Sequence, residues 1–87
     1  MTYNEIFDGV VDCIQEIMSG ENIHDNFVIT ADSVLSDDIG MTSLDKVRLQ
    51  VRLEDKFLFS FDPFDDFDKI FDSVNNLCEY IFAQKGR

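Results

Sequence analysis

Basic residues are scarce in this sequence and absent from its first half. Residues 1–42 contain no lysine or arginine, and the chain of 87 residues has a formal net charge of −11. Because nucleic acids are bound through lysine and arginine contacts to phosphate, this charge argues against a nucleic-acid-binding protein. Most of the basic side chains lie in one short stretch, which contains Lys46, Arg48, Arg52 and Lys56. That stretch forms a basic island on an acidic protein.

Long hydrophobic runs and catalytic groupings are also missing. No apolar run is long enough to span a membrane, and no basic-then-apolar leader precedes the first amphipathic stretch. We therefore expect a soluble, cytoplasmic protein without membrane insertion. The single histidine, His24, has no serine, cysteine or second histidine close to it in sequence, and we interpret it as a surface residue. With no evident nucleophile–base pair, the chain is not expected to be an enzyme.

Motifs for metal binding and redox chemistry are missing as well. The two cysteines, Cys13 and Cys78, are far apart, and neither belongs to a C-x-x-C motif. Each fits the apolar stripe of a helix, so we predict buried core thiols and no zinc or dithiol site. The aspartates between residues 64 and 72 lack the order of an EF-hand loop, which argues against calcium. No metal site is predicted.

The hydrophobic pattern predicts a helix at the start of the chain, followed by a long connection. Residues 3–18 show helical spacing of their apolar positions, and Ser19 and Gly20 supply a stop signal. The apolar stripe comprises Ile6, Val10, Cys13 or Ile14, and Ile17. Residues 21–41 show no sustained period and are rich in Asn, Asp, Ser and Thr, which indicates a loop packed across the core. The residues expected to pack this loop against the core are Ile23, Phe27, Ile29, Val34, Leu35 and Ile39.

The pattern of apolar residues in the last part of the chain predicts one short and one long helix. Residues 58–63 alternate apolar and polar side chains, and we interpret them as an extended connection that buries Phe59 and Phe61. A short helix or turn with inward-facing apolar residues is predicted for residues 64–72, and Ser73 is expected to cap the final helix. The sequence therefore predicts an all-α protein, a small four-helix bundle with a long loop between helices 1 and 2 and a short third helix.

The helix predicted over residues 44–57 has two apolar stripes. At about 100° of rotation per residue, its apolar side chains fall into two clusters on nearly opposite sides. The first stripe comprises Leu49, Leu53 and Phe57, and the second comprises Leu44, Val47 and Val51. Because a helix needs only one stripe for its core, the second indicates an exposed apolar strip that contacts partners.

Ser43 stands where this helix begins. A hydroxyl at such a junction accepts a hydrogen bond from a free N–H of the first turn, so either Ser43 or Thr42 could cap the helix. A helix N-terminus also favours an anion, since its free N–H groups and its macrodipole both attract negative charge. A phosphodiester on Ser43 would therefore be well placed, beside the second apolar stripe.

The sequence resembles a carrier protein around this serine. The resemblance lies in Gly40-Met41-Thr42-Ser43-Leu44, followed by Asp45-Lys46-Val47 and then Leu53-Glu54-Asp55-Lys56-Phe57. These runs are similar to the modification site and second helix of acyl and peptidyl carrier proteins. In that family a segment of two acidic residues, an apolar residue and a glycine precedes the modified serine, and Asp37-Asp38-Ile39-Gly40 matches it. The resemblance implies that Ser43 is the attachment residue of a 4′-phosphopantetheine arm. It covers nearly the whole chain, so one carrier-protein domain is expected over residues 1–87.

The resemblance further implies a carrier that enzymes modify and visit. A phosphopantetheinyl transferase would move the arm from coenzyme A onto Ser43 Oγ, and the arm would tether biosynthetic intermediates as thioesters. The other partners would be acyl- or aminoacyl-loading, condensing and tailoring enzymes of one pathway, and the carrier is expected to be a monomer. The predicted docking surface comprises Met41, Thr42, Leu44, Val47, Arg48, Val51 and Arg52.

Three side chains near Ser43 depart from the usual fatty-acid carriers, which present acidic residues along this helix and Asp before the serine. Here those positions hold Arg48, Arg52 and Thr42. We therefore expect a discrete acyl carrier protein of a polyketide, nonribosomal peptide or related specialised pathway, with acyl or aminoacyl cargo left open. The alternative is an unmodified acidic helical interaction domain in which Ser43 only caps its helix.

Arg48 and Arg52 are predicted to set which partner docks, because charges at the rim of an interface control encounter and selectivity. Reversing both, as Arg48→Glu with Arg52→Glu, should weaken recognition by the native partner enzyme. Rates of loading and turnover by that enzyme measure the effect, and unchanged rates would remove this role.

Overall fold

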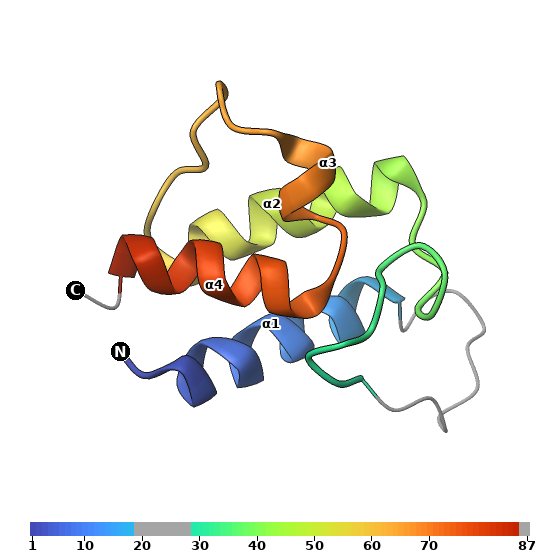
Figure 1. Cartoon of the computed structure of the whole chain (residues 1–87), viewed down its shortest axis with the longest axis horizontal. Coiled ribbons are helices and arrows are strands. Elements are labelled where there is room, and N and C mark those ends of the chain that lie inside the picture. Colours follow the sequence, from blue (N-terminus) through green and yellow to red (C-terminus); the bar gives the residue numbers. More distant parts are fainter. Residues whose placement is uncertain (19–28, 86–87) are drawn as a thin grey trace.

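The computed structural model describes residues 1–18 and 29–85, which contain helices and no strand. The elements are α1 (Tyr3–Met18), α2 (Ser43–Phe57), α3 (Phe67–Ile70) and α4 (Val74–Lys85) (Figure 1). The predicted all-α bundle with a short third helix is therefore confirmed. The expected stop at Ser19 and Gly20, the surface position of His24 and the core contacts of Ile23 and Phe27 lie outside the described residues. No helix of the described ranges is long and apolar enough to cross a membrane.

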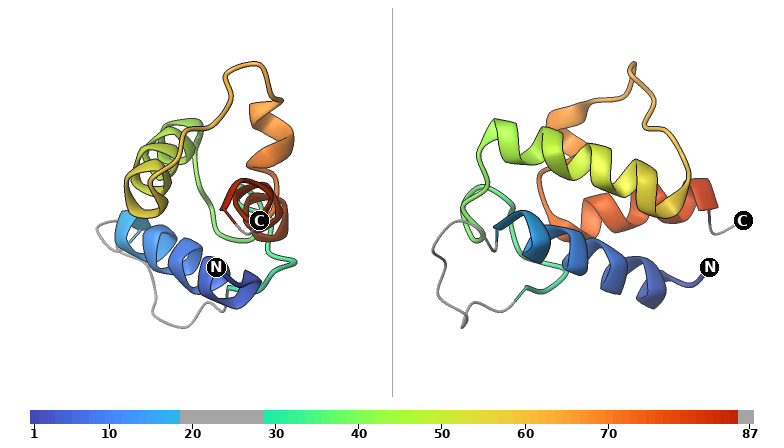
Figure 2. Two further views of the ribbon diagram at one scale, coloured as in Figure 1. Left: turned by 90° about the vertical axis from the view of Figure 1, so that its left-hand side faces the viewer. Right: turned by 180° about the vertical axis from the view of Figure 1, so that it is seen from behind.

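The core lies between α1, α2 and α4. In the left view of Figure 2, α2 and α4 are seen nearly end-on, and α1 runs beneath them and contacts both. The short α3 lies beside α4. The predicted stripe of α1 provides its buried side, with Ile6, Val10 and Ile14 fully buried and Ile17 half-buried. At the start of α1, Tyr3 donates a hydrogen bond to Asn75 Oδ1 of α4 over 2.6 Å.

Close packing brings α1 against α2. The two helices are in close contact at Gly9 of α1, where an added Cβ would meet the ring of Phe57. Phe57 is itself buried, together with Leu49 and Leu53 of the same face of α2. The absence of a side chain at Gly9 therefore leaves room for the Phe57 ring, and a larger residue would force that ring to move.

Both cysteines are buried thiols, as predicted. Cys13 lies on the face of α1 that packs into the core, and Cys78 lies on the corresponding face of α4. Neither forms a disulfide. Burial raises the pKa of the Cys78 thiol to about 11 and also raises the pKa of Cys13.

The end of the long loop is tied to the start of α4. Leu35 N–H donates to the carbonyl of Asp72 at 2.9 Å, and Val74 N–H donates to the carbonyl of Ser33 at 3.0 Å. The side chains of Leu35 and Ile39 are buried as predicted, whereas Val34 is half-buried. The chain is thus anchored just before it enters α2.

The connection from α2 to α4 is fixed by aromatic packing. Phe61 is buried and stacks on Tyr80 with a ring separation of 5.2 Å, and Phe59 is half-buried beside it. The Tyr80 hydroxyl accepts from Asp62 N–H at 3.0 Å and donates to the carboxylate of Asp65 at 2.7 Å. Ser73 caps α4, since its Oγ accepts from Asn76 N–H at 3.1 Å, as predicted.

The prediction that all apolar residues of 64–72 face inward is wrong for Phe64. Phe71 is fully buried and Phe67 stacks on it at 4.3 Å, but Phe64 is 95% exposed. The reason is local, because Asp62 Oδ1 accepts from Phe64 N–H at 2.9 Å in a tight turn that ends before α3 begins. That turn projects the Phe64 ring into solvent.

Candidate functional site

Ser43 is the first residue of α2, and a neighbour caps the helix in its place. The N-cap is Thr42, whose Oγ1 accepts from Asp45 N–H at 3.2 Å, while Asp45 Oδ2 accepts from Thr42 N–H at 3.1 Å. This reciprocal pair is a capping box. The alternative in which Ser43 caps the helix is therefore wrong. Sequence reasoning missed Asp45, although the Thr-x-x-Asp spacing could have indicated it.

The capping box leaves Ser43 available for chemistry. Its side chain is exposed, and no described residue forms a hydrogen bond with its hydroxyl. In the same first turn, the N–H groups of Ser43 and Leu44 have no acceptor within the described part of the chain. An exposed hydroxyl beside two free donors at the positive end of a helix suits a phosphodiester.

The loop before Ser43 is held in a defined path. Gly40 has φ of +83°, a left-handed conformation that favours glycine. Met41 N–H then donates to the carbonyl of Leu35 at 2.9 Å, and the Met41 side chain is only 3% exposed. Met41 was predicted to lie on the docking surface, but the structure places it in the core. Its burial fixes the point from which α2 starts.

The outer face of α2 carries the second apolar stripe. Leu44 and Val51 are each 60% exposed and Val47 is 47% exposed, whereas Leu49 and Leu53 on the opposite side are fully buried. Both predicted stripes are therefore present. We call the exposed set Leu44, Val47 and Val51 the apolar ridge. It begins next to Ser43 and runs along the helix toward its C-terminal half.

A model of a protein family, the phosphopantetheine attachment site, matches residues 8–81 of this chain. The chain belongs to this carrier family. Its members are non-catalytic carriers with a covalently attached 4′-phosphopantetheine, which a phosphopantetheinyl transferase installs. The matched range contains most of α1, all of α2 with Ser43 at its start, and most of α4.

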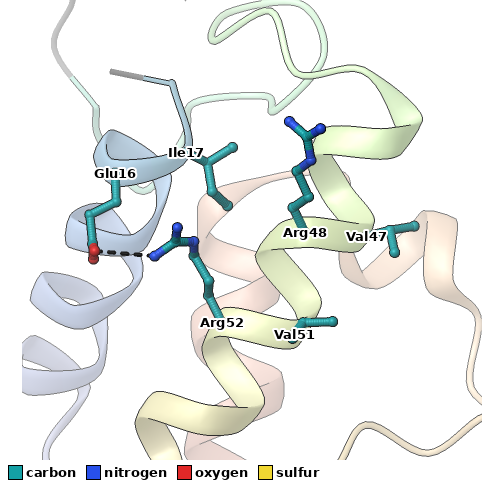
Figure 3. Close-up of a pocket in the computed structure, with 6 residues that line it drawn as sticks. All are labelled: Glu16, Ile17, Val47, Arg48, Val51 and Arg52. Atoms are coloured by element: carbon teal, nitrogen blue, oxygen red, sulfur yellow. Dashed lines mark hydrogen bonds and ion pairs between the residues drawn. The ribbon is translucent and has the colours of Figure 1, made fainter. Parts of the chain in front are cut away.

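On this carrier domain, a groove lies between α1 and α2. It has a volume of about 560 Å³ and is lined by Glu16, Ile17, Val47, Arg48, Val51 and Arg52. Arg52 reaches toward α1 and forms an ion pair with Glu16 at 3.2 Å, and Arg48 extends beside Ile17 (Figure 3). Val47 and Val51 form the far edge of the groove and point away from α1 (Figure 3). We call this region the α1–α2 groove.

The groove adds α1 residues that the sequence did not indicate as part of the site. Ile17 was assigned to the buried stripe of α1, and Glu16 was not singled out. Their approach to α2 depends on tertiary contacts between residues 36 positions apart, as in the Glu16–Arg52 pair. No local pattern encodes such a contact.

Proposed function

We propose that Ser43 carries the phosphopantetheine arm of this carrier. The observation that supports it best is the exposed Ser43 hydroxyl at the start of α2, which does not cap the helix and has two free N–H groups beside it. When bound, the arm supplies a terminal thiol that holds an intermediate as a thioester. The chain itself fixes the attachment point, because Thr42, Asp45 and the buried Met41 hold the helix start in place.

The arrangement around Ser43 supports a docking role for its surroundings. Thr42 and the apolar ridge are exposed beside the serine, and Arg48 and Arg52 lie at the ridge's α1 side. An apolar centre with charged groups at its edge is typical of protein interfaces. Transferase and pathway enzymes would dock here in turn, each through a modest, reversible contact.

The side chains around Ser43 also support a specialised pathway. Thr42 stands where acidic residues are usual in fatty-acid carriers, and Arg48 and Arg52 give α2 positive charge on an otherwise acidic chain. We propose a cytoplasmic, monomeric carrier of a polyketide, nonribosomal peptide or related pathway. Its cargo is an acyl or aminoacyl group, loaded and processed by enzymes with surfaces complementary to this helix.

Intact-protein mass spectrometry tests the proposal. The full chain is incubated with coenzyme A, magnesium and a broad-specificity phosphopantetheinyl transferase. We expect the mass to increase by one phosphopantetheinyl group, and peptide mapping should locate it on Ser43. No increase with several transferases, on protein shown by circular dichroism to be folded, would contradict it, as would modification at another residue.

A further inference from the structure

The turn that leads into α2 is closed by one carboxylate. Asp38 Oδ2 accepts from Val34 N–H at 2.7 Å, and Asp38 N–H donates back to the Val34 carbonyl at 2.8 Å. A hydrogen bond to a carboxylate at this distance is stronger than one between two neutral groups. Within the described part of the chain, no other side chain of residues 34–41 forms a hydrogen bond. The shape of this turn therefore depends on the Asp38 side chain.

The same turn joins the start of α4 to the start of α2. At its first end, Leu35 N–H donates to the carbonyl of Asp72, the second residue before α4. At its other end, Met41 N–H donates to the Leu35 carbonyl, and Ser43 follows two residues later. The path of the chain between Leu35 and Met41 therefore decides where Ser43 stands relative to the bundle.

Asp38 acts on this path without being part of the core. Its side chain is exposed, whereas Leu35, Ile39 and Met41 around it are at most 9% exposed. The buried side chains keep the turn attached to the bundle if the carboxylate is removed. What is lost is the bond that holds the exposed residues 36–38 in a single conformation. Removal of this side chain is therefore expected to loosen the turn and leave the helices folded.

Loading of the carrier requires an exact position of the Ser43 hydroxyl. Ser43 Oγ forms a bond to the phosphorus that carries the pantetheine arm of coenzyme A, while the P–O bond to the nucleotide breaks. The nucleotide leaves with that oxygen, and the hydroxyl proton passes to a base of the transferase or to water. Because the attacking and leaving oxygens must lie roughly in line, a small misplacement of Oγ lowers the rate steeply.

We propose that Asp38 is a positioning residue for the transfer of phosphopantetheine to Ser43. Its carboxylate closes the turn between Val34 and Met41, and the closed turn presents the Ser43 hydroxyl to a docked transferase in one place. Asp38 acts through the turn and not by contact with coenzyme A. The inference rests on the proposed function, in which Ser43 bears the arm, and it adds to the reaction a residue outside the predicted docking surface.

Three variants of the full chain separate the hydrogen bond of Asp38 from its charge. Asp38→Ala removes the acceptor, and Asp38→Asn keeps an acceptor oxygen in the same place without the charge. Asp37→Ala removes the adjacent exposed carboxylate, which forms no hydrogen bond within the described residues. The pair Asp38→Ala and Asp37→Ala is matched, since both lose one negative charge from the same turn.

Steady-state loading by one broad-specificity phosphopantetheinyl transferase, with coenzyme A and magnesium, measures the effect. With the carrier as the varied substrate, kcat for Asp38→Ala should fall about three- to tenfold, and KM should stay within about twofold of the wild type. For Asp38→Asn and Asp37→Ala, both constants should stay within about twofold of the wild type. A raised KM of similar size in all three variants would show that the charge docks the transferase, and it would overturn the proposal, as would wild-type kcat in Asp38→Ala.

Amide hydrogen exchange reports on the turn independently of loading. In Asp38→Ala, the Met41 amide should exchange about tenfold faster than in the wild type, whereas the Leu53 amide in the buried face of α2 should be unchanged. Equal acceleration at Leu53 would mean a general loss of stability and would contradict a positioning role. If the wild-type chain is not modified at Ser43, the proposed function itself fails, whereas normal wild-type loading with unchanged kcat in Asp38→Ala overturns only the role of Asp38.

Discussion

Ser43→Ala should abolish the gain of a phosphopantetheinyl group and leave the free energy of unfolding within about 0.5 kcal/mol of the unmodified wild type. Modification is lost because the only atom removed is the hydroxyl that would form the phosphodiester. Stability is kept because the hydroxyl is exposed and Thr42 provides the cap. Intact-protein mass spectrometry and urea denaturation measure the two effects on the same samples.

The adjacent residue supplies the matched control for Ser43. Thr42→Ala removes the cap that accepts from Asp45 N–H and should destabilise the protein by about 1 kcal/mol. It leaves the Ser43 hydroxyl in place, so the gain of mass should persist. Two neighbouring hydroxyls thus have opposite expected effects. Loss of stability in Ser43→Ala equal to that in Thr42→Ala would show that Ser43 shares the capping role.

Phe71→Ala should destabilise the fold by about 3–5 kcal/mol, a large fraction of the stability of so small a domain. The Phe71 side chain is fully buried, stacks on Phe67 at 4.3 Å and contacts the ring of Phe61 at 5.3 Å. Removing it leaves a cavity where the α2–α3 connection meets the core. Thermal and urea denaturation followed by circular dichroism measure the loss.

Phe64→Ala is the control from the same aspartate-rich segment. Because the Phe64 ring is almost entirely in solvent, its removal should change the free energy of unfolding by less than about 0.5 kcal/mol. A large loss in Phe64→Ala would mean that this ring packs against the protein in solution. Equal effects of the two changes would contradict the difference in burial between Phe71 and Phe64.

Regular spacing made the helices predictable. The first helix has the predicted bounds, Tyr3 to Met18, and α2 begins one residue earlier than predicted. The two stripes of α2 could be read from rotation alone, because each residue's direction on a helix follows from its number. The carrier resemblance rested on a contiguous motif, and the family match spans the same region.

In the irregular segments, the sequence did not indicate which apolar side chains are buried. Met41 and Phe64 are both apolar residues in non-periodic stretches, yet one is buried and the other exposed. The difference depends on single hydrogen bonds, from Met41 N–H to the Leu35 carbonyl and from Phe64 N–H to Asp62. The choice of Thr42 over Ser43 as the cap similarly depended on Asp45, three residues away. Glu16 and Ile17 lie at the site only because α1 packs against α2, which no local sequence pattern indicates.

The burial of Cys13 and Cys78 bears on how faithfully such a carrier keeps its cargo. A thioester exchanges its acyl group with any thiolate that can reach it, and the thiolate is the reactive form. Neither cysteine is accessible, and burial raises the pKa of both, so at neutral pH each stays a protonated thiol inside the core. Neither of the two thiols of the chain is therefore available to take an acyl group from the arm, and transfer to cysteine does not deplete the loaded carrier between one enzyme and the next.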